Sequence, residues 1–98
     1  MILEITPRAK ADIVDIFQYS KATWGIGKAR TYANDMRRRM KALAAGTLSG
    51  QQADEIATGL RRQVSGAHVI WFRRDAGRVR IIRILHQSRD AGQWGAEG

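Results

Sequence analysis

Hydrophobic residues recur at helical spacing through the first half of the chain and gather in short blocks through the second half. Thr6 and Pro7 precede the first periodic set and suit the N-cap and the first position of a helix. The set consists of Ala9, Ile13, Ile16, Phe17, Ser20 and Trp24. We therefore predict an amphipathic helix over about residues 7–23. Asp12 and Asp15 fall on its polar face, where we expect them to do no chemistry.

A second helix is predicted after the break at Gly25-Ile26-Gly27. Its apolar positions are Ala29, Tyr32, Ala33, Met36, Met40, Leu43 and Ala44, and Gly46 suits the C-terminal end. The opposite face carries a basic stripe: Lys28, Arg30, Arg37, Arg38, Arg39 and Lys41. Such a stripe is usually a solvated face, and the alternative is a footprint for a polyanion. The two helices should form an antiparallel hairpin with their apolar stripes facing each other and the sheet.

The stretch from Gly59 to Asp90 reads as a three-stranded antiparallel meander. Its turns are predicted at Ser65-Gly66 and at Asp75-Ala76-Gly77. Simple alternation places Ile82 and Ile84 on one face with Arg80 and His86, and Val79, Ile81 and Leu85 on the other with Arg83. An arginine among apolar neighbours needs an acidic partner, in this chain or in another. Alternation also sends Trp71 and Phe72 to opposite faces, so they form no stacking platform.

These elements predict one α+β domain over residues 1–98. A short apolar run at residues 2–5 leads into an antiparallel helical hairpin, which packs on a small antiparallel β-sheet. The polar connection from Gly46 to Gly59 has room for one helical turn near Asp54-Glu55-Ile56. The glycine-rich tail, about residues 91–98, should be loose.

Composition narrows the function through charge. Seventeen Lys and Arg against nine acidic residues give a net charge of +8, so the chain should seek a polyanion or an acidic protein. The chain has no cysteine and only two histidines, His68 and His86, which makes a metal or cofactor site improbable. The start has no signal-peptide pattern and no run is long enough to cross a membrane. We expect a cytoplasmic protein.

Catalytic chemistry is hard to find in this sequence. His86 could act as a general base, although a lone histidine at a strand end is more often structural. Metal-free RNA cleavage is the one plausible reaction for a small arginine-rich domain, with His86 and nearby arginines as its parts. The acid for the leaving oxygen is not evident.

Together these fragments resemble the ParE toxins of type II toxin–antitoxin systems, over nearly the whole chain from Leu3 to Asp90. The fragments that carry the resemblance are a leading strand, Ile13-Val14-Asp15-Ile16-Phe17-Gln18-Tyr19, Trp24-Gly25 followed by Ala29 and Tyr32, Gly59-Leu60-Arg61-Arg62, Ser65-Gly66-Ala67-His68-Val69-Ile70 and Ile84-Leu85-His86-Gln87. The resemblance implies the RelE/ParE fold, which agrees with the pattern above.

The resemblance also implies a choice between two activities. Relatives of the RelE type cut mRNA on the ribosome with basic residues and a C-terminal tyrosine or histidine, whereas ParE relatives poison DNA gyrase. In this chain Gln63 and Gln87 stand where the ribonucleases carry basic residues, and no tyrosine follows the last strand. The absence of these ribonuclease residues therefore favours gyrase inhibition without catalysis. If the chain is catalytic instead, His86 is the candidate catalytic residue.

The expected partners follow from the same resemblance. A ParD-like antitoxin would neutralise the chain through an acidic amphipathic segment, and operator DNA would be bound only through that antitoxin, in a higher-order hetero-oligomer. The predicted antitoxin contacts are Trp24, Tyr32, Met36, Met40, Arg62, Arg74 and Arg83. The predicted gyrase contacts are His86, Gln87, Arg89 and Trp94. Core membership is the competing interpretation for Met36 and Met40.

Three function classes compete at this stage. The first is a non-enzymatic topoisomerase inhibitor, the second a ribosome-dependent endoribonuclease, and the third a generic nucleic-acid-binding module supported by charge alone. An RNA reader normally offers stacking aromatics on its strands, which this sequence does not. An inactive relative is the remaining possibility.

Overall fold

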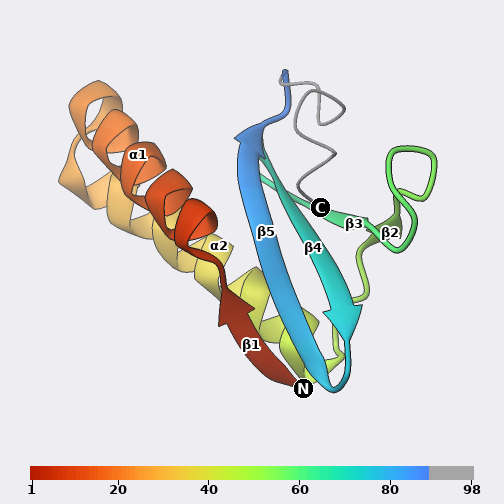
Figure 1. Cartoon of the computed structure of the whole chain (residues 1–98). Coiled ribbons are helices and arrows are strands. Elements are labelled where there is room, and N and C mark those ends of the chain that lie inside the picture. Colours follow the sequence, from red (N-terminus) through yellow and green to blue (C-terminus); the bar gives the residue numbers. More distant parts are fainter. Residues whose placement is uncertain (89–98) are drawn as a thin grey trace.

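The computed structural model describes residues 1–88 and shows a helical hairpin on one face of a five-stranded sheet (Figure 1). The order along the chain is β1 (Ile2–Ile5), α1 (Pro7–Trp24), α2 (Ile26–Ala45), β2 (Gln51–Gln52), β3 (Arg61–Ser65), β4 (His68–Asp75) and β5 (Arg78–His86). The strand order in the sheet is β1-β5-β4-β3-β2. The α+β class and the hairpin-on-sheet arrangement are confirmed.

The helices begin and end where local chemistry predicts. The Thr6 side chain accepts a hydrogen bond from the Ala9 amide at 3.2 Å and so caps α1. Gly46 ends α2 in the left-handed conformation, which a residue with a side chain rarely adopts. The predicted break at residues 25–27 is shorter than expected. Gly25 alone separates the helices, and Gly27 lies within the first turn of α2.

The sheet is mixed, which the sequence did not reveal. β1 runs parallel to β5, while β2, β3, β4 and β5 pair antiparallel in succession. Both predicted turns join their strands, and a β-bulge interrupts the pairing of β4 with β5 between Trp71 and Phe72. Trp71 pairs with Arg83 and Phe72 with Ile81, so Ile82 is the extra residue.

The bulge corrects the predicted faces of β5. Val79, Ile81 and Ile84 share one core cluster, whereas Ile82 and Leu85 belong to the other. Strict alternation had placed Ile84 and Ile81 on different faces and had placed Leu85 on the same face as Ile81. One inserted residue exchanges the two faces of the strand beyond it.

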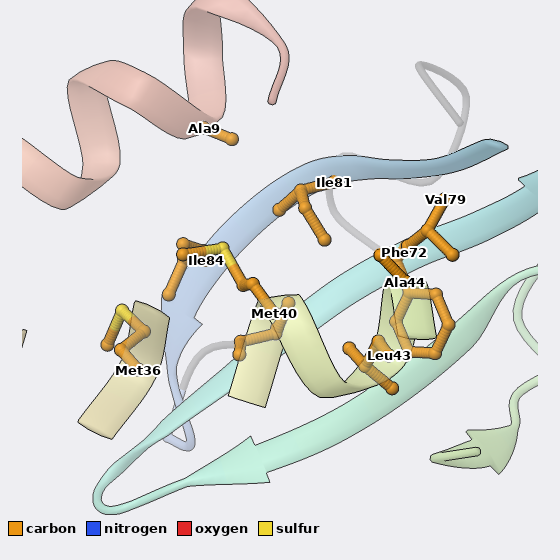
Figure 2. Packing of buried hydrophobic residues seen from close by; sticks show 10 residues of the cluster. Ala9, Met36, Met40, Leu43, Ala44, Phe72, Val79, Ile81 and Ile84 are labelled. Carbon is orange, nitrogen blue, oxygen red and sulfur yellow. The ribbon is translucent and has the colours of Figure 1, made fainter. Parts of the chain in front are cut away.

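The main core lies between the hairpin and the sheet. Figure 2 shows Met36, Met40, Leu43 and Ala44 of α2 pointing toward Phe72, Val79, Ile81 and Ile84 of the sheet. A smaller cluster covers the opposite face, where the connection after α2 packs Ala53, Ile56, Ala57 and Leu60 on Trp71, Val69, Ile82 and Leu85. Trp71 and Phe72 thus point to opposite faces, as predicted.

The connection from residue 46 to residue 59 contains the expected single helical turn, because the Ala57 amide donates to the carbonyl of Ala53, four residues earlier, at 3.3 Å. It also forms β2, and the Ala53 amide donates a hydrogen bond of 2.8 Å to the Leu60 carbonyl. The apolar residues of this loop are needed to cover the sheet, and turns place them there. Within residues 1–88, no helix combines the length and apolar character that a bilayer crossing demands.

Candidate functional site

A cleft lies between the helical hairpin and one end of the sheet. Its volume is about 550 Å³, which falls in the usual range of ligand pockets. We call it the hairpin cleft, and its lining residues are Asp15, Ile16, Tyr19, Trp24, Tyr32, Ala67, His68 and His86. The lining is mainly apolar and aromatic, with a few convergent polar groups. This composition is typical of a binding site.

Two aromatic rings of α1 form the exposed rim of the hairpin cleft. Tyr19 is 64% and Trp24 is 55% exposed, and their rings meet edge to face with centroids 5.9 Å apart. Within residues 1–88, both rings therefore remain largely accessible to a partner. Large exposed aromatic side chains are common anchors in protein interfaces.

The Tyr32 hydroxyl organises the floor of the hairpin cleft. It lies 3.1 Å from the Ser65 carbonyl, 2.9 Å from the Ala67 amide and 2.6 Å from Nδ1 of His68. A phenol has one proton to donate, and the Ser65 carbonyl can only accept. The hydrogen-bond network therefore assigns Nδ1 of His68 as a donor to Tyr32, which leaves Nε2 of neutral His68 unprotonated.

Burial is the larger cause, and the nearby His86 the smaller, of a lowered pKa at His68, below the ordinary value of 6.5. The rings of His68 and His86 meet edge to face, with centroids 5.4 Å apart. Nδ1 of His86 accepts the Ser88 amide proton at 3.1 Å, so Nε2 carries the proton of neutral His86. The cleft therefore offers one histidine acceptor and one histidine donor.

The turn between β3 and β4 allows Tyr32 to approach this closely. Gly66 has φ +59°, and a Cβ atom built there would lie 2.5 Å from the Tyr32 ring. Only glycine fits both the conformation and the space. The turn was predicted from the sequence, whereas the close contact with α2 was not.

Asp12 joins the first half of α1 to the edge of β5, a structural role that the sequence did not predict. Its carboxylate accepts two hydrogen bonds from the Arg83 guanidinium, at 2.9 and 3.1 Å, and one from the Ile84 amide at 2.9 Å. The hydrogen bond to Asp12 is the main cause of a raised pKa at Arg83. The predicted need of Arg83 for an acidic partner is thus met within the chain.

The structure divides the predicted antitoxin contacts. Trp24 and Tyr32 lie in the hairpin cleft, while Met36 and Met40 are core residues only 2% and 3% exposed. The two methionines therefore offer no surface to a partner in this conformation, which corrects their assignment.

The arginines predicted to contact an antitoxin lie apart. Arg62 is 3.8 Å from Glu55 and 6.0 Å from the Trp71 ring. Arg74 donates to the Leu48 carbonyl at 3.1 Å, and Arg83 is held by Asp12. None of the three lines the hairpin cleft within the described residues.

The predicted gyrase contacts begin at the same cleft. His86 lines it, and the Gln87 amide closes the end of β5 by donating to the Ala67 carbonyl at 2.9 Å. Arg89 and Trp94 lie outside the described residues. Sequence reasoning missed His68 and Tyr19 as cleft residues. Helical periodicity placed Tyr19 on the face opposite Trp24, and nothing in the pattern brought His68 opposite His86.

A second groove of about 490 Å³ lies between the two helices. It is lined by Ile13, Val14, Phe17, Gln18, Arg30, Ala33, Asn34 and Arg37. Two arginines of the predicted basic stripe thus flank apolar residues. Among residues 1–88, no group of three or more His, Cys, Asp or Glu side chains could hold a metal ion.

Comparison with known proteins gives one consistent family. The sequence model described as the ParE toxin of type II toxin-antitoxin system, parDE, matches residues 3–91. The chain is 40% identical over 87 residues to the protein named Toxin ParE1 of Caulobacter vibrioides, covering 89% of this chain and 90% of that protein. It is 29% identical over 87 residues to Toxin ParE1 of Mycobacterium tuberculosis, covering 88% of this chain and 89% of that protein.

One solved structure supports the fold independently. The chromosomal ParDE TA system from P. aeruginosa contains a chain that superposes with a TM-score of 0.76, at 24% sequence identity. The match covers 88% of this chain and 95% of that chain.

Proposed function

Because the chain belongs to the ParE toxin family of type II toxin–antitoxin systems, we propose that it inhibits DNA gyrase and that a ParD-like antitoxin neutralises it. The observation that carries this proposal is the family match over residues 3–91, which spans both helices and the whole sheet. A match of this extent includes the hairpin cleft as well as the scaffold.

The chemistry of the hairpin cleft supports inhibition without catalysis. Cleavage of a phosphodiester needs cationic groups for the negative charge that develops on the phosphate. No described residue that lines the cleft is lysine or arginine, and Asp15 brings a carboxylate there instead. A phosphate would therefore be repelled at the position where His68 and His86 could exchange protons with it.

The paired histidines nevertheless favour one alternative. His68 could serve as a base through Nε2, and His86 could hold the proton of a leaving group. A ribosome-dependent mRNA endoribonuclease of the RelE type is therefore the second candidate, in which the ribosome or the RNA would have to supply the missing cation.

Neutralisation follows from where the predicted contacts meet. Trp24 and Tyr32, predicted for the antitoxin, and His86, predicted for gyrase, line the same cleft. We infer that the antitoxin inhibits by covering the surface that gyrase needs. The net charge of +8 would speed encounter with an acidic antitoxin segment, while apolar anchors supply most of the affinity.

Two assays on the purified chain test the proposal. One follows gyrase supercoiling and accumulation of cleaved DNA, and the other follows mRNA cleavage on ribosomes, each with and without the antitoxin. We expect loss of supercoiling, restored by the antitoxin, with intact mRNA. Cleaved mRNA with unaffected gyrase would replace the proposal with the endoribonuclease.

A truncation tests the predicted gyrase contacts beyond the described residues. Ending the chain after Ser88 removes Arg89 and Trp94 but keeps the Gln87 hydrogen bond to Ala67. We expect the truncated chain to keep its fold and its antitoxin binding and to lose gyrase inhibition. Full inhibition would remove Arg89 and Trp94 from the contact set.

The proposed assembly has its own measurement. We propose a higher-order toxin–antitoxin hetero-oligomer that binds operator DNA only through the antitoxin. Light scattering of the purified complex gives its mass, and a gel-shift assay with each component alone separates their DNA affinities. Binding of operator DNA by the toxin alone would contradict this arrangement.

A further inference from the structure

The outer edge of β5 is closed over most of its length. β1 pairs with residues 78–81, and the Thr6 amide donates to the Ile81 carbonyl at 3.1 Å. The Thr6 hydroxyl donates to the Ile82 carbonyl at 3.0 Å, and Asp12 accepts the Ile84 amide proton. The start of α1 thus continues, with side chains, the hydrogen bonding that β1 began.

Beyond the Ile84 amide, no residue of the described range 1–88 pairs with this edge. The Ile84 amide points to α1 and the Gln87 amide points to Ala67, on the opposite side of the strand. In an antiparallel ladder, the N–H and C=O of one residue point the same way, and the direction alternates along the strand. The Ile84 carbonyl and both backbone groups of His86 therefore face outward. No residue within 1–88 supplies them with a hydrogen-bond partner.

The open edge borders the hairpin cleft. His86 belongs to both, and α1 supplies the opposite wall with Asp15, Ile16 and Tyr19. A strand laid along the edge would project every second side chain to one side. One such side chain would enter the cleft and meet the Tyr19 and Trp24 rings.

We propose that an extended segment of the antitoxin adds to β5 as a short strand at Ile84–His86 and places a bulky apolar side chain in the hairpin cleft. The inference rests on the proposed function, in which an antitoxin neutralises this chain. It goes beyond that function by naming the edge, the backbone groups and the anchor.

Three observations identify the occupant. Unpaired backbone donors and acceptors on a strand edge are complemented by another polypeptide. The aromatic lining of the cleft favours an apolar side chain, and Asp15 disfavours an acidic one. Outside the cleft, the net charge of +8 favours acidic residues on either side of the anchor.

A matched pair of substitutions tests strand addition. His86→Pro and His86→Ala both remove the imidazole, but only proline also removes the outward N–H. Proline is tolerated where the strand N–H faces away from the ladder, so we expect both variants to fold. We expect His86→Pro to bind the antitoxin about tenfold more weakly than His86→Ala, since one hydrogen bond is lost and the edge is blocked. Equal affinities of the two folded variants would overturn strand addition.

A second pair tests the anchor and decides the proposal if His86→Pro unfolds. Trp24 and Val64 are similarly exposed, at 55% and 52%, but Val64 lies on β3 and does not line the cleft. We expect Trp24→Ala to weaken antitoxin binding at least about tenfold and Val64→Ala to leave it unchanged within about twofold. Equal losses in both variants would overturn the cleft as the docking site.

Assays on the unmodified chain distinguish failure of the docking site from failure of the proposed function. Gyrase inhibition that the antitoxin relieves, combined with failure of both pairs, would reject the docking site and keep the proposed function. Absence of antitoxin binding by the unmodified chain would reject both.

Discussion

The two halves of the β5 edge are built in opposite ways. In the first half, β1 pairs with residues 78–81, the Thr6 hydroxyl donates to the Ile82 carbonyl, and Asp12 accepts the Ile84 amide proton. From the Ile84 carbonyl to His86, the edge faces the aromatic hairpin cleft. Exposed strand edges invite association, and proteins usually cover or charge them. We attribute stability to the first half and propose recognition of the antitoxin for the second half.

The same contrast holds for the acidic residues of α1. Asp12 is fixed by Arg83 and Ile84, whereas Asp15, one turn further along, lines the open cleft. α1 thus passes from a structural contact to the proposed binding surface within one turn. Substitutions on the two sides of this boundary should therefore have different effects.

The largest expected effect comes from breaking the closed half. Asp12→Ala leaves the Arg83 guanidinium, 15% exposed, without its carboxylate and frees the Ile84 amide. We expect the free energy of unfolding to fall by about 3 kcal/mol, measured by urea denaturation. Asp15→Ala is the control and should change it by less than about 0.5 kcal/mol. Equal effects would contradict the division of the edge.

The next effect concerns the wall of the open half. Gly66→Ala forces a left-handed backbone and drives Cβ to within 2.5 Å of the Tyr32 ring. We expect a loss of about 2 kcal/mol. Gly77→Ala has the same left-handed strain at φ +80° with nothing within 4 Å, so it should cost about 1 kcal/mol. The additional loss of stability in Gly66→Ala over Gly77→Ala measures the cost of the contact with the Tyr32 ring. Equal losses would mean that Tyr32 moves aside freely.

A smaller effect is expected from removing the hydroxyl at the cleft floor. Tyr32→Phe leaves the Ala67 amide and the Ser65 carbonyl without this partner. We expect a loss of about 1 kcal/mol in unfolding free energy, together with a change in the histidine NMR signals. Tyr19→Phe removes an exposed hydroxyl on the rim and should be neutral. Loss of stability at Tyr19 instead would reverse the roles given to the two rings.

The smallest effect is a pH dependence set by His68. Burial lowers its pKa in the folded state, so the unfolded chain binds the proton more readily. Stability from this group is complete above the unfolded pKa, near 6.5, and declines as pH falls through the folded pKa. The His68→Gln variant should lose less stability than the unmodified chain between about pH 7 and pH 5. Parallel pH profiles would show that His68 titrates normally.

Much of the scaffold was predictable because local chemistry determines it. Thr6 and Pro7 start a helix, Gly46 ends one, and two glycine turns define the hairpins of the sheet. The arginine at position 83 was correctly expected to need an acid. The sequence did not identify Asp12 as the partner of Arg83, because helical periodicity placed Asp12 on a polar face. Periodicity does not show that this face of α1 lies against β5 just beyond the end of β1.

The hairpin cleft was only partly predictable. Trp24, Tyr32 and His86 were chosen for different partners, and tertiary packing brings them together. Counting back from the turn at residues 75–78 would place His68 opposite Leu85, and the bulge at Ile82 places it opposite His86 instead. Sequence alternation gives no signal for such an insertion, so the histidine pair emerges only from the structure.

Hydrogen exchange along β5 tests the contrast between the two halves most directly. NMR would follow the Ile84 and His86 amides in the free chain and in its antitoxin complex. We expect Asp12 to protect the Ile84 amide in both states. We expect the His86 amide to exchange rapidly until the antitoxin binds. A His86 amide that remains unprotected in a saturated complex would contradict strand addition at the open half of the edge.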